Sequence, residues 1–131
     1  MDCPHCDGDL VAFAVPEDFR KYAPDETGSA TICATCLRVE AAEGEAAGAD
    51  PDFSAVDDSF PSGRGGVATA LLLGKLDSLA LNRADISELA DEAEQAGADP
   101  FLTLDRLASS PTIEPHFDID RRRPQLEQLM E

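Results

Sequence analysis

Four cysteines, arranged as two Cys-x-x-Cys pairs, constrain this chain more than any other feature. The first pair is Cys3 and Cys6, the second is Cys33 and Cys36, and 26 residues lie between the pairs. Each pair turns tightly enough for both sulfurs to face one ion, so two pairs can supply the four corners of a tetrahedron. The spacing therefore predicts one structural Zn²⁺ bound by all four thiolates. A shell closed by four ligands leaves no position for water or substrate, so this metal would organise the chain rather than catalyse a reaction.

Three other arrangements compete for the same ligands. A rubredoxin-like iron centre uses an identical set, a redox-active thiol pair uses one Cys-x-x-Cys motif, and structural disulfides would use all four sulfurs. Redox motifs of this kind normally begin a helix after a strand, and a second matched pair has no part in them. Disulfides are typical of secreted proteins, whereas this sequence opens with no secretory signal and no apolar run of membrane length. We therefore expect a cytoplasmic protein without a membrane segment.

The charge balance is strongly acidic. The 131 residues include 27 acidic and 10 basic side chains, which gives a formal net charge of −17, and the only lysines are Lys21 and Lys75. Repulsion among so many like charges opposes the compact state at ordinary ionic strength, whereas the Debye length falls to about 3 Å near 1 M salt. The composition therefore predicts the surface of a halophilic protein. An acidic mesophilic protein or a disordered tail is the alternative.

Shifts in composition divide the chain into three parts. Residues 1–40 carry the metal ligands, residues 41–66 form an acidic, Ala/Gly-rich stretch typical of a linker or loop, and residues 67–131 show helical periodicity. The sequence thus predicts the α+β class, with an N-terminal four-cysteine zinc ribbon of antiparallel strands, a linker and a small all-α helical unit. Three apolar side chains interrupt the linker and are expected to pack inside the molecule rather than on a partner: Phe53, Val56 and Phe60.

The first part predicts a ribbon of short strands. Residues 10–15 are apolar and compatible with a strand, and residues 17–22 suit a short helical turn. Residues 30–32 lead into the second cysteine pair and residues 37–40 lead out of it, so this pair should lie at the tip of a hairpin. Gly8 is expected to adopt a positive φ in the first knuckle. A module of about 40 residues rarely folds alone, so metal binding, worth on the order of 10 kcal/mol, should supply most of its stability.

The last part predicts four short helices. A capping-box-like pair precedes the second helix, and an Asp-Pro step precedes the third. The expected starts are Val67, Asp85, Asp99 and Pro124. The apolar face of the first helix comprises Ala68, Leu72, Leu76 and Leu79, widened by Leu71 and Leu73. This excess of leucine predicts either a surface for a partner or a completed internal core.

The sequence contains no constellation that predicts catalysis. His5 and His116 have no nucleophile near them in the local sequence, and both are expected to be structural or surface residues. The glycine-rich stretch 62–66 lacks the spacing and lysine of a phosphate-binding loop, so it predicts a flexible entry to a helix. Asp118 and Asp120 could bind a hard cation, but such a pair is more typical of a solvated surface. We therefore expect neither enzyme activity nor a small-molecule substrate.

Arginines 121–123 form the one basic cluster of the sequence. Zinc ribbons often contact nucleic acid, but acidic residues flank these arginines and should pair with them, and the overall field repels phosphate. The function that the sequence favours is a non-catalytic adaptor that binds another protein or a second copy of the chain. A nucleic-acid-associated or transcription-related ribbon is the alternative, and a rubredoxin-like or thiol redox protein is a third possibility.

Two segments carry a resemblance to a known family. Cys-Pro-His-Cys followed by residues 10–13, together with residues 32–37, in an acidic and lysine-poor chain, resembles a family of small haloarchaeal proteins that are zinc-finger-like and functionally uncharacterised. The resemblance is specific across residues 1–40 and concerns helical layout and length across residues 67–131. It implies a zinc ribbon on the four cysteines and implies no reaction. Asp7 departs from the pattern, because many zinc ribbons have glycine directly after the second cysteine.

Overall fold

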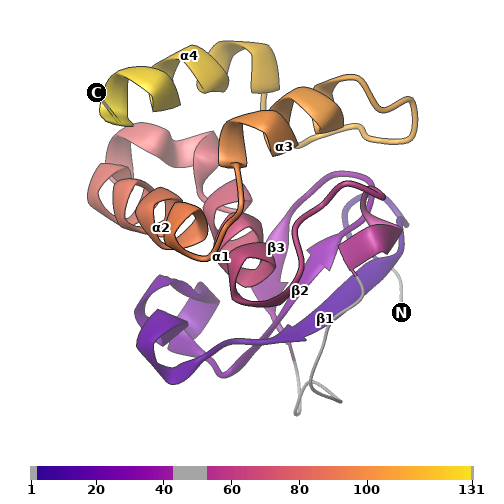
Figure 1. Cartoon of the computed structure of the whole chain (residues 1–131). Helices are drawn as coiled ribbons and strands as arrows, with labels where there is room; N and C mark the ends of the chain where they lie inside the picture. The colour runs from indigo at the N-terminus through magenta and orange to yellow at the C-terminus, as the bar shows by residue number, and fades with distance from the viewer. Residues whose placement is uncertain (1–2, 43–52, 131) are drawn as a thin grey trace.

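The computed structural model describes residues 3–42 and 53–130. Figure 1 shows a small sheet on one side of the molecule, α1 and α2 in the middle, and α3 and α4 on the far side. The strands are β1 (Leu10–Ala14), β2 (Ser29–Cys33) and β3 (Val39–Ala41), and the α-helices are α1 (Gly63–Leu73), α2 (Arg83–Gln95), α3 (Pro100–Ala108) and α4 (Ile119–Met130). Short 3-10 segments connect them: η1 (Glu17–Tyr22), η2 (Pro24–Glu26), η3 (Phe53–Ala55) and η4 (Leu76–Leu81). The predicted α+β class is confirmed.

The sheet is antiparallel, in the order β1-β2-β3. Val11 pairs with Ile32 and Phe13 pairs with Ala30, so these four side chains share one face, and all four are buried. The second cysteine pair joins β2 to β3, which confirms the predicted hairpin. The predicted helical turn at residues 17–22 is also present, as the 3-10 segment η1.

One hydrophobic core joins the sheet to the helices, from Val11 in β1 to Leu126 in α4. The ring of Phe53 lies 5.5 Å from that of Phe13 and 5.1 Å from that of Phe60. Val56 is buried as well, so the expectation that these three side chains of the linker pack inside the molecule is confirmed. Residues 43–52 of that linker lie outside the described ranges. The division into residues 1–40, 41–66 and 67–131 stays a prediction.

The glycine-rich stretch before the first helix is wrongly predicted as a flexible entry. Helix α1 begins at Gly63, and the glycines form its first turn. A Cβ atom on Gly66 would lie 2.3 Å from the carbonyl oxygen of Pro61 and 2.8 Å from the ring of Phe53. Glycine is therefore required here because two other segments approach the helix backbone closely, a contact that local sequence does not reveal.

The leucines of α1 complete an internal core. Leu72 and Leu73 are fully buried and Leu71 is only 1% exposed, so the expectation of a partner surface on Leu71 and Leu73 is wrong. The predicted apolar face is buried throughout, but it does not belong to one helix. The α-helix ends at Leu73, and the chain continues through Gly74 into η4. A Cβ on Gly74 would lie 2.6 Å from Cβ of Val39, so α1 ends directly against β3.

The predicted starts of the later helices have mixed outcomes. Asp99 is the N-cap of α3, and its side chain accepts a hydrogen bond from the amide of Leu102. Helix α2 begins at Arg83, so Asp85 lies in its first turn and pairs instead with Lys75 at 3.5 Å. The predicted capping box is therefore wrong.

Helix α4 begins at Ile119, earlier than the predicted start at Pro124. The side chain of Asp118 accepts a hydrogen bond from the amide of Arg121 at 3.2 Å, which satisfies one of the free donors of the first turn. Asp118 therefore caps α4, whereas the sequence predicts a solvated surface residue at this position.

Several basic side chains are engaged within the molecule. Arg64 pairs with Asp18 of η1 at 2.5 Å and with Glu92 of α2 at 2.9 Å, and its guanidinium lies 4.0 Å from the ring centre of Phe19. The hydrogen bond from Arg64 also lowers the pKa of Asp18 below its usual value. This side chain ties the sheet region to α2 across the start of α1, a role that the sequence did not indicate.

The arginines of α4 are partly paired, as predicted. Arg123 contacts Glu127 one turn ahead and lies 2.6 Å from Asp105 of α3. Arg122 donates to the carbonyl oxygen of Asp77 in η4 at 3.1 Å. Asp105 and the η4 carbonyl are partners that sequence proximity does not suggest.

Across the described ranges, none of the helices has the combination of length and hydropathy that a membrane span requires.

Candidate metal centre

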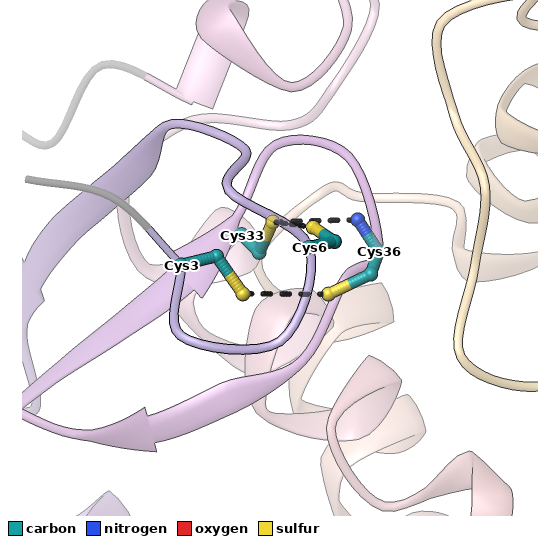
Figure 2. A group of neighbouring side chains, drawn as sticks. All are labelled: Cys3, Cys6, Cys33 and Cys36. Atoms are coloured by element: carbon teal, nitrogen blue, oxygen red, sulfur yellow. Dashed lines mark hydrogen bonds between the residues drawn. The ribbon is translucent and has the colours of Figure 1, made fainter.

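All four cysteine sulfurs converge at one end of the sheet. They lie within 4.8 Å of one another, with Sγ of Cys3 3.8 Å from Sγ of Cys36 and Sγ of Cys6 3.5 Å from Sγ of Cys33. Figure 2 shows the four side chains pointing toward one another from two loops. Cys6 is exposed and the other three cysteines are buried. The structure therefore brings together the complete set of predicted ligands.

The two cysteine pairs lie on loops with the same backbone hydrogen bond and the same left-handed residue after the second cysteine. In the first, the amide of Asp7 donates to the carbonyl oxygen of Cys3 at 2.9 Å; in the second, the amide of Leu37 donates to that of Cys33 at 3.1 Å. The residue after each second cysteine is left-handed, with φ of 63° at Asp7 and 66° at Leu37. We call these loops the first and second knuckle, residues 3–8 and 33–38. Their likeness explains why both pairs present two sulfurs to one point.

The expectation of a positive φ at Gly8 is wrong, because Asp7 takes that conformation instead. Aspartate is among the residues that tolerate the left-handed region. Gly8 has a different role: a Cβ there would lie 2.6 Å from Oγ1 of Thr35 and 2.9 Å from Sγ of Cys33. The glycine thus lets the first knuckle approach the second closely enough for their sulfurs to share one ion.

Backbone amides supply polar contacts to the sulfur of Cys33. The amides of Thr35 and Cys36 lie 3.3 Å and 3.4 Å from it, in the direction of donation. Such contacts favour a thiolate, but burial outweighs them and raises the pKa of the Cys33 thiol to about 12 in the absence of a cation. Burial likewise raises the pKa of Cys36. A positive ion at the centre would supply the charge that keeps these buried sulfurs deprotonated.

Cys3 differs from the cysteines of the second knuckle. Burial alone would raise the pKa of its thiol, but hydrogen bonds from the backbone amides of His5 and Cys6 bring it below the usual value. The thiol of Cys3 therefore has a lower pKa than the thiols of Cys33 and Cys36, which burial raises.

Two of the sulfur–sulfur distances match the edge of a tetrahedral metal site. With Zn–S bonds of about 2.3 Å, a regular tetrahedron has sulfur–sulfur edges of about 3.8 Å. The separations of 3.8 Å and 3.5 Å between sulfurs of opposite knuckles lie close to that edge length. Four sulfur donors are the ligand set of structural zinc and of mononuclear iron sites. The site is thus compatible with metal binding, and its donors satisfy an ion without any further residue.

Both histidines lie close to the knuckles without being needed as ligands. Nε2 of His5 is 3.4 Å from a carboxylate oxygen of Glu40 in β3. His116 contacts the carbonyl oxygen of Cys36 through its backbone amide and through Nδ1, each at 2.8 Å. The structural role expected for His116 is therefore confirmed.

The sequence did not predict the contacts that residues around His116 make with the second knuckle. The amide of Glu114 donates to the carbonyl oxygen of Thr35 at 2.8 Å, next to the His116 contact. These contacts join residues about 80 positions apart, so no local pattern points to them. Pro115, which favours an extended backbone in the residue before it, is the one local hint.

Comparison with known proteins gives one informative result. The chain has no significant match among curated proteins or among solved structures. One family model covers residues 2–130, nearly the whole sequence, and so includes the four cysteines, the sheet and all four α-helices. On that coverage, the chain belongs to the family of unknown function DUF6276.

Proposed function

We propose that this chain is a non-catalytic zinc protein of a halophile, in which one structural Zn²⁺ holds the ribbon in shape and the folded surface binds another protein or a second copy. The observation that carries the metal part is the convergence of four sulfurs within 4.8 Å. Four thiolates fill a tetrahedral shell, so the ion has no open position at which to activate water or polarise a substrate. Its contribution is therefore to stability and shape.

Protein binding is supported by the distribution of exposed apolar and basic side chains. Among the described residues, the large apolar side chains that are exposed are Leu81, at 88%, and Leu102, at 51%. Leu81 ends η4 beside the start of α2, where it can enter an apolar pocket of a partner. Arg64 and Arg123, by contrast, are paired with carboxylates of this chain, which compete with phosphate for them. The acidic net charge also opposes nucleic acid, which remains the alternative partner.

The metal part is tested by elemental analysis and native mass spectrometry of protein purified in high salt under reducing conditions. One zinc per chain is expected, with a mass that also reports whether the chain is monomeric or paired. One iron per chain in place of zinc would instead indicate a rubredoxin-like centre. A disulfide between cysteines in freshly reduced protein, or less than half an ion per chain, would remove the structural metal from the proposal.

The partner is tested by crosslinking and capture at molar KCl with the Leu81→Asp variant. Ala80→Asp is the matched control, because Ala80 is also exposed and receives the same added charge. We expect the wild type and Ala80→Asp to retain a protein partner or to dimerise, and Leu81→Asp to lose it. A monomeric wild type that retains DNA or RNA instead would favour the nucleic-acid alternative.

The proposal that the protein is halophilic predicts that its stability rises with salt. With a net charge of −17, the thermal midpoint should rise between about 0.1 M and 2 M KCl, because salt screens repulsion and strengthens apolar burial. Differential scanning calorimetry measures the midpoint, and sucrose, which strengthens burial without screening charge, serves as the comparison. A flat or falling midpoint in KCl would indicate an acidic protein adapted to ordinary salt.

A further inference from the structure

The segment between α3 and α4 contacts the second knuckle through two backbone hydrogen bonds. We call residues 113–117 the clasp. The amide of Glu114 donates to the carbonyl of Thr35, and the amide of His116 donates to the carbonyl of Cys36, both at 2.8 Å. The imidazole reaches the second of these oxygens as well, at 2.8 Å from Nδ1, and donates to it in the tautomer that has its proton on Nδ1.

Each peptide group that the clasp contacts is also bonded to a metal ligand. The peptide between Thr35 and Cys36 accepts from the clasp through its oxygen and donates to Sγ of Cys33 through its N–H, at 3.4 Å. The peptide between Cys36 and Leu37 likewise accepts from the clasp and donates to the carbonyl of Cys33, at 3.1 Å. Both peptide planes are therefore fixed between Cys33 and the clasp.

The peptide between Cys36 and Leu37 has an orientation that requires stabilisation by neighbouring groups. Leu37 has φ of 66°, a left-handed conformation that is unfavourable for a residue other than glycine. Leucine is nevertheless present, and its side chain is fully buried. The clasp stabilises the peptide orientation on which this conformation depends, and that orientation places Cys36 opposite Cys3.

The clasp is itself anchored in the core. Ile113 and Phe117 are buried at its two ends, and the ring of His116 packs edge-on against Phe117 at 5.0 Å. Helix α4 begins at Ile119, two residues after the end of the clasp. The clasp therefore links the second knuckle, through hydrogen bonds, to the start of α4.

We propose that metal binding and clasp docking are thermodynamically coupled: the ion in the four-cysteine site stabilises the clasp on the second knuckle, and the clasp increases metal affinity by positioning Cys33 and Cys36. This inference rests on the proposed metal function and extends it to positioning residues far along the chain. Coupling of two equilibria is reciprocal, so each must change the other by the same factor. Partners that hold metal ligands through hydrogen bonds commonly contribute 10–100-fold in affinity.

The affinity arm compares Glu114→Pro with Glu114→Ala. Proline removes the N–H that donates to Thr35, whereas alanine keeps that N–H and removes only the exposed side chain. Titration with Co²⁺, followed by its thiolate absorption, and competition by Zn²⁺ give the dissociation constants. We expect Glu114→Pro to weaken binding roughly tenfold relative to Glu114→Ala. His116→Ala, which keeps the backbone amide, should weaken it roughly fivefold and covers the case in which the proline variant does not fold.

The exchange arm uses the wild-type chain with Zn²⁺ and after removal of Zn²⁺ by a chelator. Hydrogen exchange at the amides of Glu114 and His116 should accelerate on metal removal much more than exchange at Leu89 and Ala93 in α2. Those two are buried in a helix that does not carry the clasp.

The outcomes separate this inference from the metal function. If the wild type takes up no stoichiometric Co²⁺ or Zn²⁺, the metal function fails. If the wild type binds tightly while Glu114→Pro and His116→Ala bind as tightly as Glu114→Ala, the coupling is wrong and the metal function stands. Exchange at the two clasp amides that rises no more than exchange in α2 would also overturn the coupling.

Discussion

Replacing Cys33 by serine is expected to abolish stoichiometric zinc binding and to lower the thermal midpoint by more than roughly 10 °C. Structural zinc contributes on the order of 10 kcal/mol, which is comparable to the whole stability of a domain. Cys33 also ends β2, directly after Ile32, whose side chain is fully buried in the shared core. Losing this ligand therefore releases both knuckles and loosens the edge of the core.

Elemental analysis, calorimetry and hydrogen exchange measure these effects on the Cys33→Ser variant. Exchange should rise most across residues 3–42, while circular dichroism of the helices persists in large part. Thr35→Ser is the matched control, because it changes the same knuckle and keeps all four ligands. One zinc per chain in Cys33→Ser, or a midpoint equal to that of the control, would contradict a structural metal.

Replacing Gly66 by alanine is expected to destabilise the fold by roughly 1–3 kcal/mol, the usual cost of overpacking a core. On helix propensity alone alanine would be better by about 1 kcal/mol, so the expected sign is opposite to that of the intrinsic preference. The new Cβ would lie 2.3 Å from the carbonyl oxygen of Pro61, a backbone atom that cannot turn aside as a side chain can.

Gly65→Ala provides the comparison for urea denaturation of Gly66→Ala. A Cβ on Gly65 would lie 3.0 Å from the methyl carbon of Ala98, which a small shift relieves. We expect Gly65→Ala to stay within about 1 kcal/mol of the wild type, because the gain in propensity offsets the tighter contact. Equal stability of the two alanine variants would show that the start of α1 is not as closely packed against Pro61 and Phe53 as described.

The features that the sequence predicted correctly are those that short spacing determines. Two Cys-x-x-Cys pairs indicated the four cysteines that the fold brings together, because the geometry that turns two sulfurs toward one point is contained in each tetrapeptide. Apolar runs beside the cysteine pairs likewise located the strands, and the spacing of apolar residues identified the buried face that runs from α1 into η4. These signals require no knowledge of what packs against them.

The features that the sequence missed depend on contacts between distant segments. The sequence predicts a flexible position at Gly66, because the close approach of Pro61 and Phe53 to its backbone is not visible in the local pattern. The excess of leucine at Leu71 and Leu73 left two interpretations open, and the decision came from the sheet and the helices that cover them. Pairing of the clasp with the second knuckle joins segments about 80 residues apart, and Pro115 is its one local hint.

The distance along the chain between the second knuckle and the clasp has a consequence for synthesis. Cys36 and His116 are 80 residues apart, and ribosomes add roughly 5–20 residues per second, so about 4–16 s separate the appearance of the two partners. All four thiols leave the ribosome well before the residues that fix the second knuckle. If the four cysteines hold a metal ion as proposed, the nascent chain would bind or exchange that ion through a second knuckle that the clasp does not yet restrain. Completion of the chain would then end this interval.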